Sequence, residues 1–285
     1  MGARSLLSLA ITLSRFRFWI YTGGTYVVGY SLAISRWQDF LLPEYYLYLL
    51  YFFFPANLFI YGVNDLWDTA TDAANPKKDR WEIRVGQEHR RDLLFLLTVV
   101  TAASLLLLLL QDWTERAIFS GFLLFSYAYS APPLRFKERP LLDFSSNILY
   151  LMPGIFGYYL ASGTMPPVLF LAAGFCHVAA MHIFSAIPDI EYDRAAGITT
   201  TPVRIGRQAS LLLCLLFWTG LSALLLLLSG LHPLAFLVLL YPLFPLSLLV
   251  RRDLEISRLY WYLPYVNIAL GGLLFTAMLV VRGGW

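Results

Sequence analysis

Long apolar runs alternate with short polar segments along the whole chain. A window of about 20 residues, the length of α-helix that crosses a bilayer, picks out nine candidate spans. They are residues 16–34, 41–63, 93–110, 117–131, 144–161, 167–187, 209–229, 233–250 and 262–281. This pattern predicts an all-α membrane protein of about nine transmembrane helices that form a bundle. We expect a single polytopic domain over residues 1–285.

Composition and charge agree with this pattern. Hydrophobic residues make up 59% of the 285 positions and charged residues only 14%, whereas a soluble domain is about one-quarter charged. With the N-terminus inside, 18 of the 21 Lys and Arg residues fall in inner segments, as the positive-inside rule requires. The chain is therefore predicted to be integral to the cell membrane, with a cytoplasmic N-terminus and an outer C-terminus. The net charge of +3 reflects this topology and does not indicate a nucleic-acid partner.

A polar stretch, PANLFIYGVNDLWDTATDAANPKKDR, ends the second apolar run. At about 100° per residue on a helix, four of its polar side chains fall within a stripe of about 100°. These are Asn64, Asp65, Asp68 and Asp72. Three carboxylates on one face repel each other, and Mg²⁺ removes the conflict because it takes oxygen ligands from carboxylates and phosphates. Lys77 and Lys78 follow directly, so the stretch predicts a Mg-diphosphate site.

The loop after this first acidic motif, residues 73–92, is the longest polar stretch. It is predicted to be cytoplasmic. A solvated cap and a lid that closes over the substrate are both compatible with its mixed charges.

A second acidic motif, residues 189–193, ends the sixth apolar run. Asp189 and Asp193 are one helical turn apart and share a face, whereas Glu191 points away. Asp65 and Asp189 are 124 residues apart, at the ends of the second and sixth runs. This offset of four spans predicts two duplicated four-helix halves with one acidic site in each. Five unpaired aspartates in a membrane would cost about 12–17 kcal/mol. A cavity that holds metal and phosphate on the cytoplasmic side explains them better.

A basic loop at residues 130–140 lies between the two acidic motifs. In YSAPPLRFKERPLLD, Arg135 and Lys137 follow two prolines. The loop is either a positive-inside anchor or a phosphate clamp, and we favour the clamp because it lies on the same side of the membrane as the acidic motifs. Arg15, at the start of the first span, is a further candidate for diphosphate binding.

Three stretches resemble the signatures of the UbiA-type intramembrane prenyltransferases: NDLWDTATD, YSAPPLRFKERP and IPDIEYDRAAGITTTPVRIG. The resemblance implies nine transmembrane helices around a central cavity, with Mg²⁺ bridging the aspartates and a prenyl diphosphate. Carried over by position, the metal ligands are Asn64, Asp68, Asp72, Asp189 and Asp193. The residues expected to touch the diphosphate are Lys77, Arg135 and Lys137.

A finer similarity is carried by SRFRFWIYTGG, PANLFIYGVND and DAANPKKD, which resemble the lycopene elongase branch of that family. The resemblance implies transfer of a five-carbon unit from dimethylallyl diphosphate to the ends of lycopene, in some members with addition of water. A lipophilic acceptor of this kind implies a cavity that opens sideways into lipid.

The expected mechanism begins with loss of diphosphate, which the metal and the basic residues stabilise. The catalytic residues are then Asp68, Asp72, Asp189 and Asp193. Aromatic faces can stabilise the allylic cation or simply lie at the membrane interface. The candidates are Tyr61, Trp67, Tyr129 and Tyr192.

Two other functions compete with this interpretation. A related enzyme would attach a longer prenyl tail to an aromatic quinone precursor, and an ion-coupled transporter would also use intramembrane carboxylates. Transporters usually carry such groups in the middle of a span, whereas these carboxylates lie at span ends. His177 and His182 in the sixth run are interpreted as satisfied histidines of the bundle.

Overall fold

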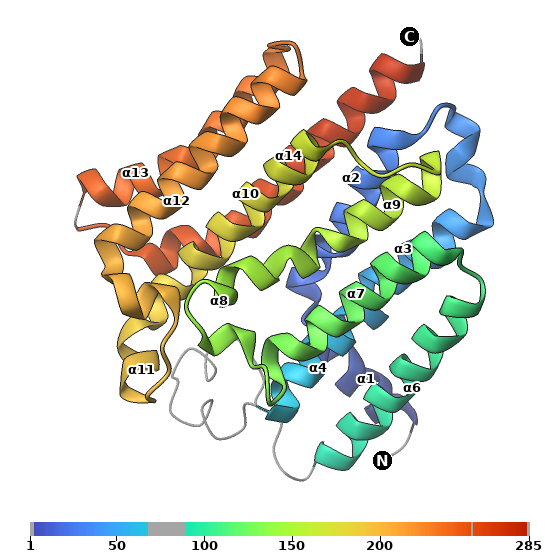
Figure 1. Ribbon diagram of the computed structural model, residues 1–285, viewed down its shortest axis with the longest axis horizontal. Coiled ribbons are helices and arrows are strands. Elements are labelled where there is room, and N and C mark those ends of the chain that lie inside the picture. The colour runs from blue at the N-terminus through green and yellow to red at the C-terminus, as the bar shows by residue number, and fades with distance from the viewer. Residues whose placement is uncertain (1–2, 68–88, 252, 284–285) are drawn as a thin grey trace. The chain divides into compact units, whose positions relative to one another are not determined.

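The computed structural model describes residues 3–67, 89–251 and 253–283. Within these ranges the chain forms α-helices and short 3₁₀ helices, and no strand (Figure 1). The predicted all-helical class is confirmed for this part of the chain.

The helices cluster into two compact units. The first consists of Met1–Arg135 with Met152–Gly163, and the second of Phe136–Leu151 with Thr164–Trp285. The fifth predicted span is therefore divided, since its first part packs in the second unit and its second part in the first.

In its described residues, the first unit contains six α-helices joined by sharp breaks, a further α-helix from the fifth span, and two 3₁₀ helices. They are α1 (Ala3–Leu13), η1 (Phe16–Tyr21), α2 (Gly23–Ala33), η2 (Trp37–Leu41), α3 (Pro43–Phe53), α4 (Pro55–Trp67), α6 (Arg90–Leu109), α7 (Trp113–Ser130) and α9 (Met152–Ser162).

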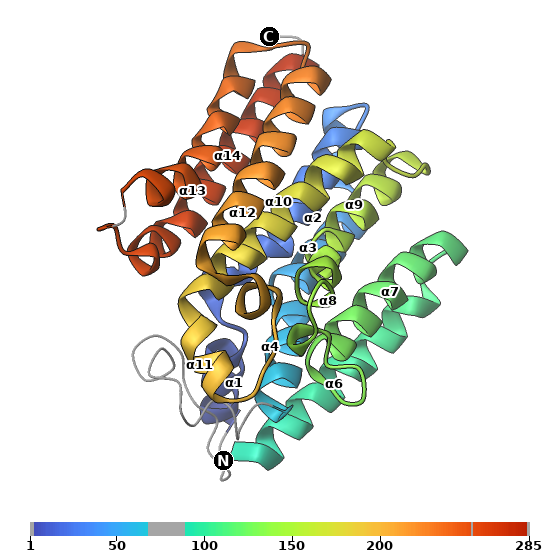
Figure 2. The ribbon, with the colours of Figure 1, turned by 60° about the vertical axis from the view of Figure 1, so that its left-hand side comes forward.

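The second unit is organised around two long helices, α10 (Val168–Ala186) and α12 (Thr201–Leu228), which lie side by side in Figures 1 and 2. Its other elements are η5 (Phe136–Glu138), α8 (Leu142–Ser145), η6 (Ser146–Tyr150), η7 (Ile187–Asp189), α11 (Ile190–Ala195), η8 (Pro233–Leu239), α13 (Leu240–Val250) and α14 (Ile256–Gly283). Trp218 and Phe184 are fully buried between these helices.

Five helical segments in the described ranges are long and apolar enough to cross a membrane. They are Pro43–Trp67, Arg90–Leu109, Val168–Ala195, Thr201–Leu228 and Pro233–Val250. Each coincides with one of the nine predicted runs. Of the other four runs, 16–34 is divided between η1 and α2, and 144–161 is divided among α8, η6 and α9. The count of nine spans stays a prediction.

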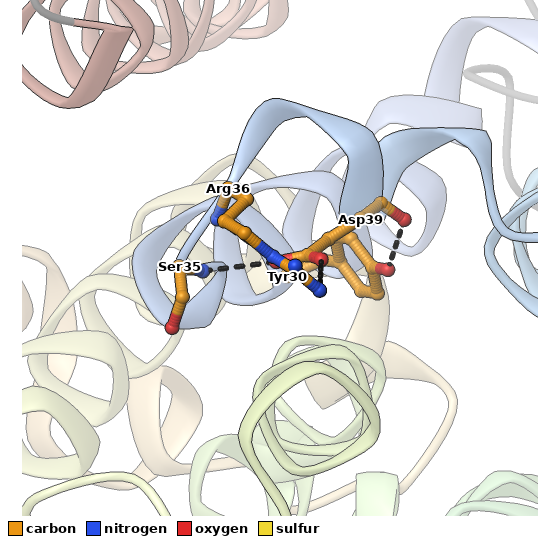
Figure 3. A network of polar contacts seen from close by, with 4 residues as sticks. All are labelled: Tyr30, Ser35, Arg36 and Asp39. Atoms are coloured by element: carbon orange, nitrogen blue, oxygen red, sulfur yellow. Dashed lines mark hydrogen bonds and ion pairs between the residues drawn. The ribbon is translucent and has the colours of Figure 1, made fainter.

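Aromatic side chains form much of the core of the first unit. Tyr26 and Tyr30 are buried, and their hydroxyls donate to main-chain carbonyls of Tyr45 (3.0 Å) and Asp39 (2.6 Å). Figure 3 shows how the Asp39 carboxylate in turn accepts the N–H groups of Ser35 and Arg36 at 3.0 and 2.9 Å. The turn between α2 and α3 is thus held by hydrogen bonds that reach into the core.

The break between α3 and α4 follows from Pro55, which has no N–H group to continue the helix. The side-chain amide of Asn57 donates to the freed carbonyls of Phe52 and Phe53 at 3.1 and 2.9 Å. It also donates to the Thr22 hydroxyl at 2.6 Å, which itself donates to the Phe52 carbonyl. Side chains therefore satisfy carbonyl groups at the end of α3, as a helix break inside a bilayer requires.

The contact between α2 and α9 depends on glycine. A Cβ atom on Gly29 would lie 1.9 Å from the Gly154 carbonyl oxygen, and one on Gly154 would lie 2.9 Å from the Thr25 carbonyl oxygen. The two helices would have to move apart to accommodate any larger residue. Small residues allow close backbone approach in the same way in other pairs of membrane helices.

We expect Gly29→Ala to destabilise the protein by about 1–3 kcal/mol, because the added methyl group collides with backbone that cannot rotate away. The midpoint of thermal unfolding in lipid or detergent measures the effect. Gly271→Ala is the matched control, since a Cβ atom there meets nothing within 4 Å. Equal midpoints for the two variants would contradict the close contact.

Candidate functional site

The last turn of α4 brings the first acidic motif against the start of the chain. Asp65 is only 6% exposed, and its Oδ1 atom accepts a hydrogen bond from Nη2 of Arg15 at 2.8 Å. Arg15 is 13% exposed. Because a buried charge is stable only when it is paired and hydrogen-bonded, this ion pair fixes both side chains.

The Arg15 guanidinium also lies over the ring of Tyr61, 4.7 Å from its centroid. Tyr61 is four residues before Asp65 on α4, so both side chains face the same neighbour. Arg15 itself adopts φ 53°, a left-handed conformation that costs a residue other than glycine about 1–3 kcal/mol. The ion pair and the aromatic contact hold this conformation at the junction of α1 and η1. Tyr61, predicted as a cation-stabilising residue, lies beneath the cation of Arg15.

Asn64 is directed to a different element from its neighbour Asp65. Its Oδ1 atom accepts a hydrogen bond from the Ser130 hydroxyl, at the end of α7, at 3.1 Å. An amide oxygen accepts hydrogen bonds through its lone pairs, so this bond orients the Asn64 side chain.

The remaining predicted residues of the first motif lie outside the described residues: Asp68, Asp72, Lys77 and Lys78. Two further aromatic residues of the predicted set lie within the described residues, at the ends of α4 and α7. Trp67 is 40% exposed at the end of α4, and Tyr129 is half-buried near the end of α7.

The second acidic motif begins where α10 gives way to η7 at Pro188. Asp189 ends η7 and Asp193 lies in α11, and both side chains are partly exposed. Glu191 is exposed and accepts a hydrogen bond from Arg194 at 3.1 Å. Tyr192, another predicted aromatic candidate, is 46% exposed.

A glycine ends α11 directly after this motif. Gly197 has φ 73°, its N–H donates to the Arg194 carbonyl, and the N–H of Ile198 donates to the Asp193 carbonyl at 2.8 Å. This pair of bonds is a Schellman motif, which needs a left-handed residue at the position that glycine fills. The turn signal at Ala196-Gly197 thus places Asp193 in the last turn of its helix.

The basic loop contains the predicted phosphate-binding residues Arg135 and Lys137. Arg135 has φ 41°, and Lys137 lies in η5. Both side chains are half-buried.

A buried carboxylate in the second unit was missed by the sequence analysis. Asp143 is fully buried, and its two oxygens accept the N–H of Thr201 and the hydroxyl of Thr201, both at 2.6 Å. The Thr201 hydroxyl also accepts the N–H of Leu141 at 2.7 Å. Because Thr201 begins α12, the carboxylate lies at the positive end of a long helix. This cluster ties the segment after the basic loop to the segment after the second acidic motif.

A signal for this cluster exists in the sequence, although it is weak. The Thr200-Thr201-Pro202 stretch is typical of a helix start, and Thr200 caps α12 by accepting the N–H of Val203. Nothing in the pattern identifies Asp143, 58 residues away, as its partner.

His177 differs from the predicted satisfied histidine. Its ring packs edge-on against Tyr241, with centroids 4.8 Å apart, and its Nδ1 atom has no hydrogen-bond partner among the residues that the structure describes. The prediction is wrong for that nitrogen.

The oxygen donors of both motifs match the preference of Mg²⁺ for carboxylate and amide ligands. Within the described ranges, which exclude Asp68 and Asp72, no three His, Cys, Asp or Glu residues are grouped as a metal site. The described donors are Asn64 and Asp65 in the first unit and Asp189 and Asp193 in the second.

We expect Asp143→Ala to lower the free energy of unfolding by about 2–4 kcal/mol. The N–H groups of Thr201 and Phe144 and the Thr201 hydroxyl would all lose the acceptor that Asp143 provides. The thermal unfolding midpoint in lipid measures this. Glu191→Ala is the control, since its ion pair with Arg194 is exposed and such pairs contribute little. A loss of the same size in the control would contradict the role of the buried cluster.

Three comparisons with known proteins bear on this site. The sequence profile of the UbiA prenyltransferase family matches residues 22–258. A lycopene elongase/hydratase of Haloferax volcanii is 40% identical over 272 residues, covering 94% of this chain and 87% of the relative. Another from Halobacterium salinarum is 38% identical over 268 residues, covering 93% and 94%.

Solved structures share the fold. A UbiA homologue from Archaeoglobus fulgidus bound to GPP and Mg²⁺ has a TM-score of 0.71 at 22% identity, covering 94% of this chain and 99% of that one. A digeranylgeranylglyceryl phosphate synthase has a TM-score of 0.69 at 16% identity, covering 95% and 97%. The resemblance seen in the three sequence signatures is confirmed: the chain belongs to the UbiA prenyltransferase family and is an integral membrane prenyltransferase.

Proposed function

We propose that the protein transfers the dimethylallyl group of dimethylallyl diphosphate to an end of lycopene or a related carotenoid, in a Mg²⁺-dependent reaction. The observation that carries this proposal is the 40% identity, over 94% of the chain, to a protein named lycopene elongase/hydratase. A UbiA homologue with a TM-score of 0.64 was solved with DMAPP and Mg²⁺, which supports the choice of donor.

The reaction breaks the bond between the allylic carbon and the diphosphate oxygen, and the electron pair leaves with the diphosphate. The terminal alkene of the acceptor then forms a carbon–carbon bond with the allylic cation. This leaves a tertiary cation on the acceptor, which loses a proton or is captured by water with loss of a proton.

The chain's own residues have three roles in this proposal. The predicted set of oxygen ligands for the metal is Asn64, Asp65, Asp68, Asp72, Asp189 and Asp193. Diphosphate is bound by Arg15, Lys77, Lys78, Arg135 and Lys137. The allylic cation is stabilised by the aromatic faces of Tyr61, Trp67, Tyr129 and Tyr192. Mg²⁺, when bound, would neutralise the charge that develops on the leaving diphosphate.

The membrane supplies the acceptor, because a carotenoid does not leave the bilayer. We place the N-terminus and both acidic motifs on the cytoplasmic side, where the basic loops also lie. The donor is then drawn from the cytoplasm and the acceptor from lipid.

The test is incubation of the protein in lipid vesicles with Mg²⁺, dimethylallyl diphosphate and lycopene, followed by mass analysis of the pigments. We expect products heavier by five-carbon units, lost on addition of a chelator. Asp189→Asn should lower the rate by about 100-fold or more, as the loss of a group that stabilises transition-state charge does.

Glu191→Gln is the matched control, two residues away and exposed; it should keep most of the activity. Prenylation of a hydroxybenzoate or naphthoate by a longer donor, with lycopene inert, would reassign the acceptor to an aromatic quinone precursor. Inactivity of folded protein with every donor and acceptor would overturn the proposal and favour an ion-coupled transporter.

We expect Ser130→Ala to raise the Mg²⁺ concentration needed for half-maximal rate by about 10-fold, because partners that orient a metal ligand affect metal affinity on this scale. Ser126→Ala is the control. Ser126 lies one turn earlier on α7 and bonds to the Phe122 carbonyl of its own helix. Equal Mg²⁺ dependence in the two variants would show that Ser130 does not orient Asn64.

A further inference from the structure

The first unit holds an array of contacts between α4 and the start of the chain that the proposed reaction does not by itself require. Asn57, Tyr61 and Asp65 recur every four residues along α4 and so face one neighbour. The neighbour offers Thr22, Phe18 and Arg15 in reverse order. Asn57 donates to Thr22 at 2.6 Å, the rings of Tyr61 and Phe18 are 5.7 Å apart, and Arg15 donates to Asp65 at 2.8 Å.

This array fixes where the guanidinium of Arg15 lies. The side chain is held by a carboxylate on α4 and lies over an aromatic ring one turn earlier on the same helix. A guanidinium carries five N–H donors in a planar fork, and the Asp65 carboxylate accepts from the Nη2 atom of this fork. Because the guanidinium of Arg15 is already held in place, it can bind phosphate oxygens without the entropic cost of ordering its side chain.

Asp65 differs in its contacts from its neighbour Asn64. Asn64 is directed to Ser130 on α7, whereas Asp65 is buried against Arg15 at the junction of α1 and η1. A metal ion and a guanidinium compete for the same carboxylate. Removal of Asp65 would leave the Arg15 charge without the carboxylate that compensates its burial.

We propose that Asp65 is a positioning residue that sets Arg15 for binding of the donor diphosphate, and that it is not a metal ligand. This rests on the proposed function, because it takes an allylic diphosphate as the donor. It narrows the predicted set of metal ligands in the first motif to Asn64, Asp68 and Asp72.

The experiment measures donor and metal binding separately, in protein reconstituted into lipid nanodiscs. The donor probe is dimethylallyl S-thiolodiphosphate, whose carbon–sulfur bond resists ionisation, and the metal probe is Mn²⁺ counted by electron paramagnetic resonance. We expect Asp65→Asn to weaken binding of the donor probe by about 10-fold or more. Its Mn²⁺ affinity, measured without donor, should stay within about twofold of wild type.

Arg15→Gln should weaken donor binding to the same extent, and the double variant should be no weaker than either single variant, because both act through one interaction. Arg15→Lys keeps the charge but loses the planar fork, so it should bind the donor probe with intermediate affinity. Asp65→Glu keeps the charge but moves the carboxylate. It replaces Asp65→Asn in the same binding measurements if Asp65→Asn does not yield folded protein.

Arg36→Gln and Asp39→Asn are the controls. They remove another Arg–Asp pair of the first unit, at the turn before α3, where the two groups are 3.8 Å apart and Arg36 is 77% exposed (Figure 3). Both should bind donor and metal as wild type does. A fall in Mn²⁺ affinity for Asp65→Asn but not for Arg15→Gln would overturn the proposal and make Asp65 a ligand. The proposal would also be overturned if the losses of donor affinity in the two single variants added up in the double variant.

These outcomes are separate from failure of the proposed function. Wild-type protein that binds Mn²⁺ but neither this probe nor its geranyl homologue would overturn the proposed donor, and the role of Arg15 with it. If only the inference about Asp65 fails, wild-type protein binds the donor probe and Mn²⁺ normally, but the variants do not show the losses of affinity predicted above.

Discussion

A helix break inside a bilayer has no water to satisfy its backbone groups, and the rest of this structure depends on that constraint. Pro55 interrupts the second apolar run, and the side chain of Asn57 takes over the freed carbonyls. Gly197 ends α11 with two backbone bonds, and the carboxylate of Asp143 satisfies the first N–H of α12. Each of these three interruptions is therefore accompanied by its own set of internal hydrogen bonds.

Two charged groups of the candidate site lie at further interruptions of the helices. Arg15 lies between α1 and η1, and Asp189 lies where α10 passes into η7 and α11. A continuous helix satisfies its own backbone and presents mainly apolar side chains to lipid, so it offers little place for a charge. Broken helices supply both the local polarity and the directed side chains that binding of a diphosphate requires.

Much of the fold followed from the sequence, because hydropathy, proline and glycine act locally. The helical class, five of the apolar spans and the turn at Gly197 are confirmed. The divisions of the first and fifth runs were not predicted, because a hydropathy window averages over a break that leaves composition unchanged. The partners of Asp65 and Asp143 lie 50 and 58 residues away, and a single carboxylate carries no periodic signal that identifies a distant partner.

The most direct test of this account is an experimental structure of the protein in lipid with Mg²⁺ and dimethylallyl S-thiolodiphosphate. We expect the diphosphate in contact with Arg15, Asn64 in contact with the metal, and Asp65 still bound to the guanidinium of Arg15. A structure in which Asp65 coordinates the metal, or in which Arg15 does not touch the diphosphate, would contradict it.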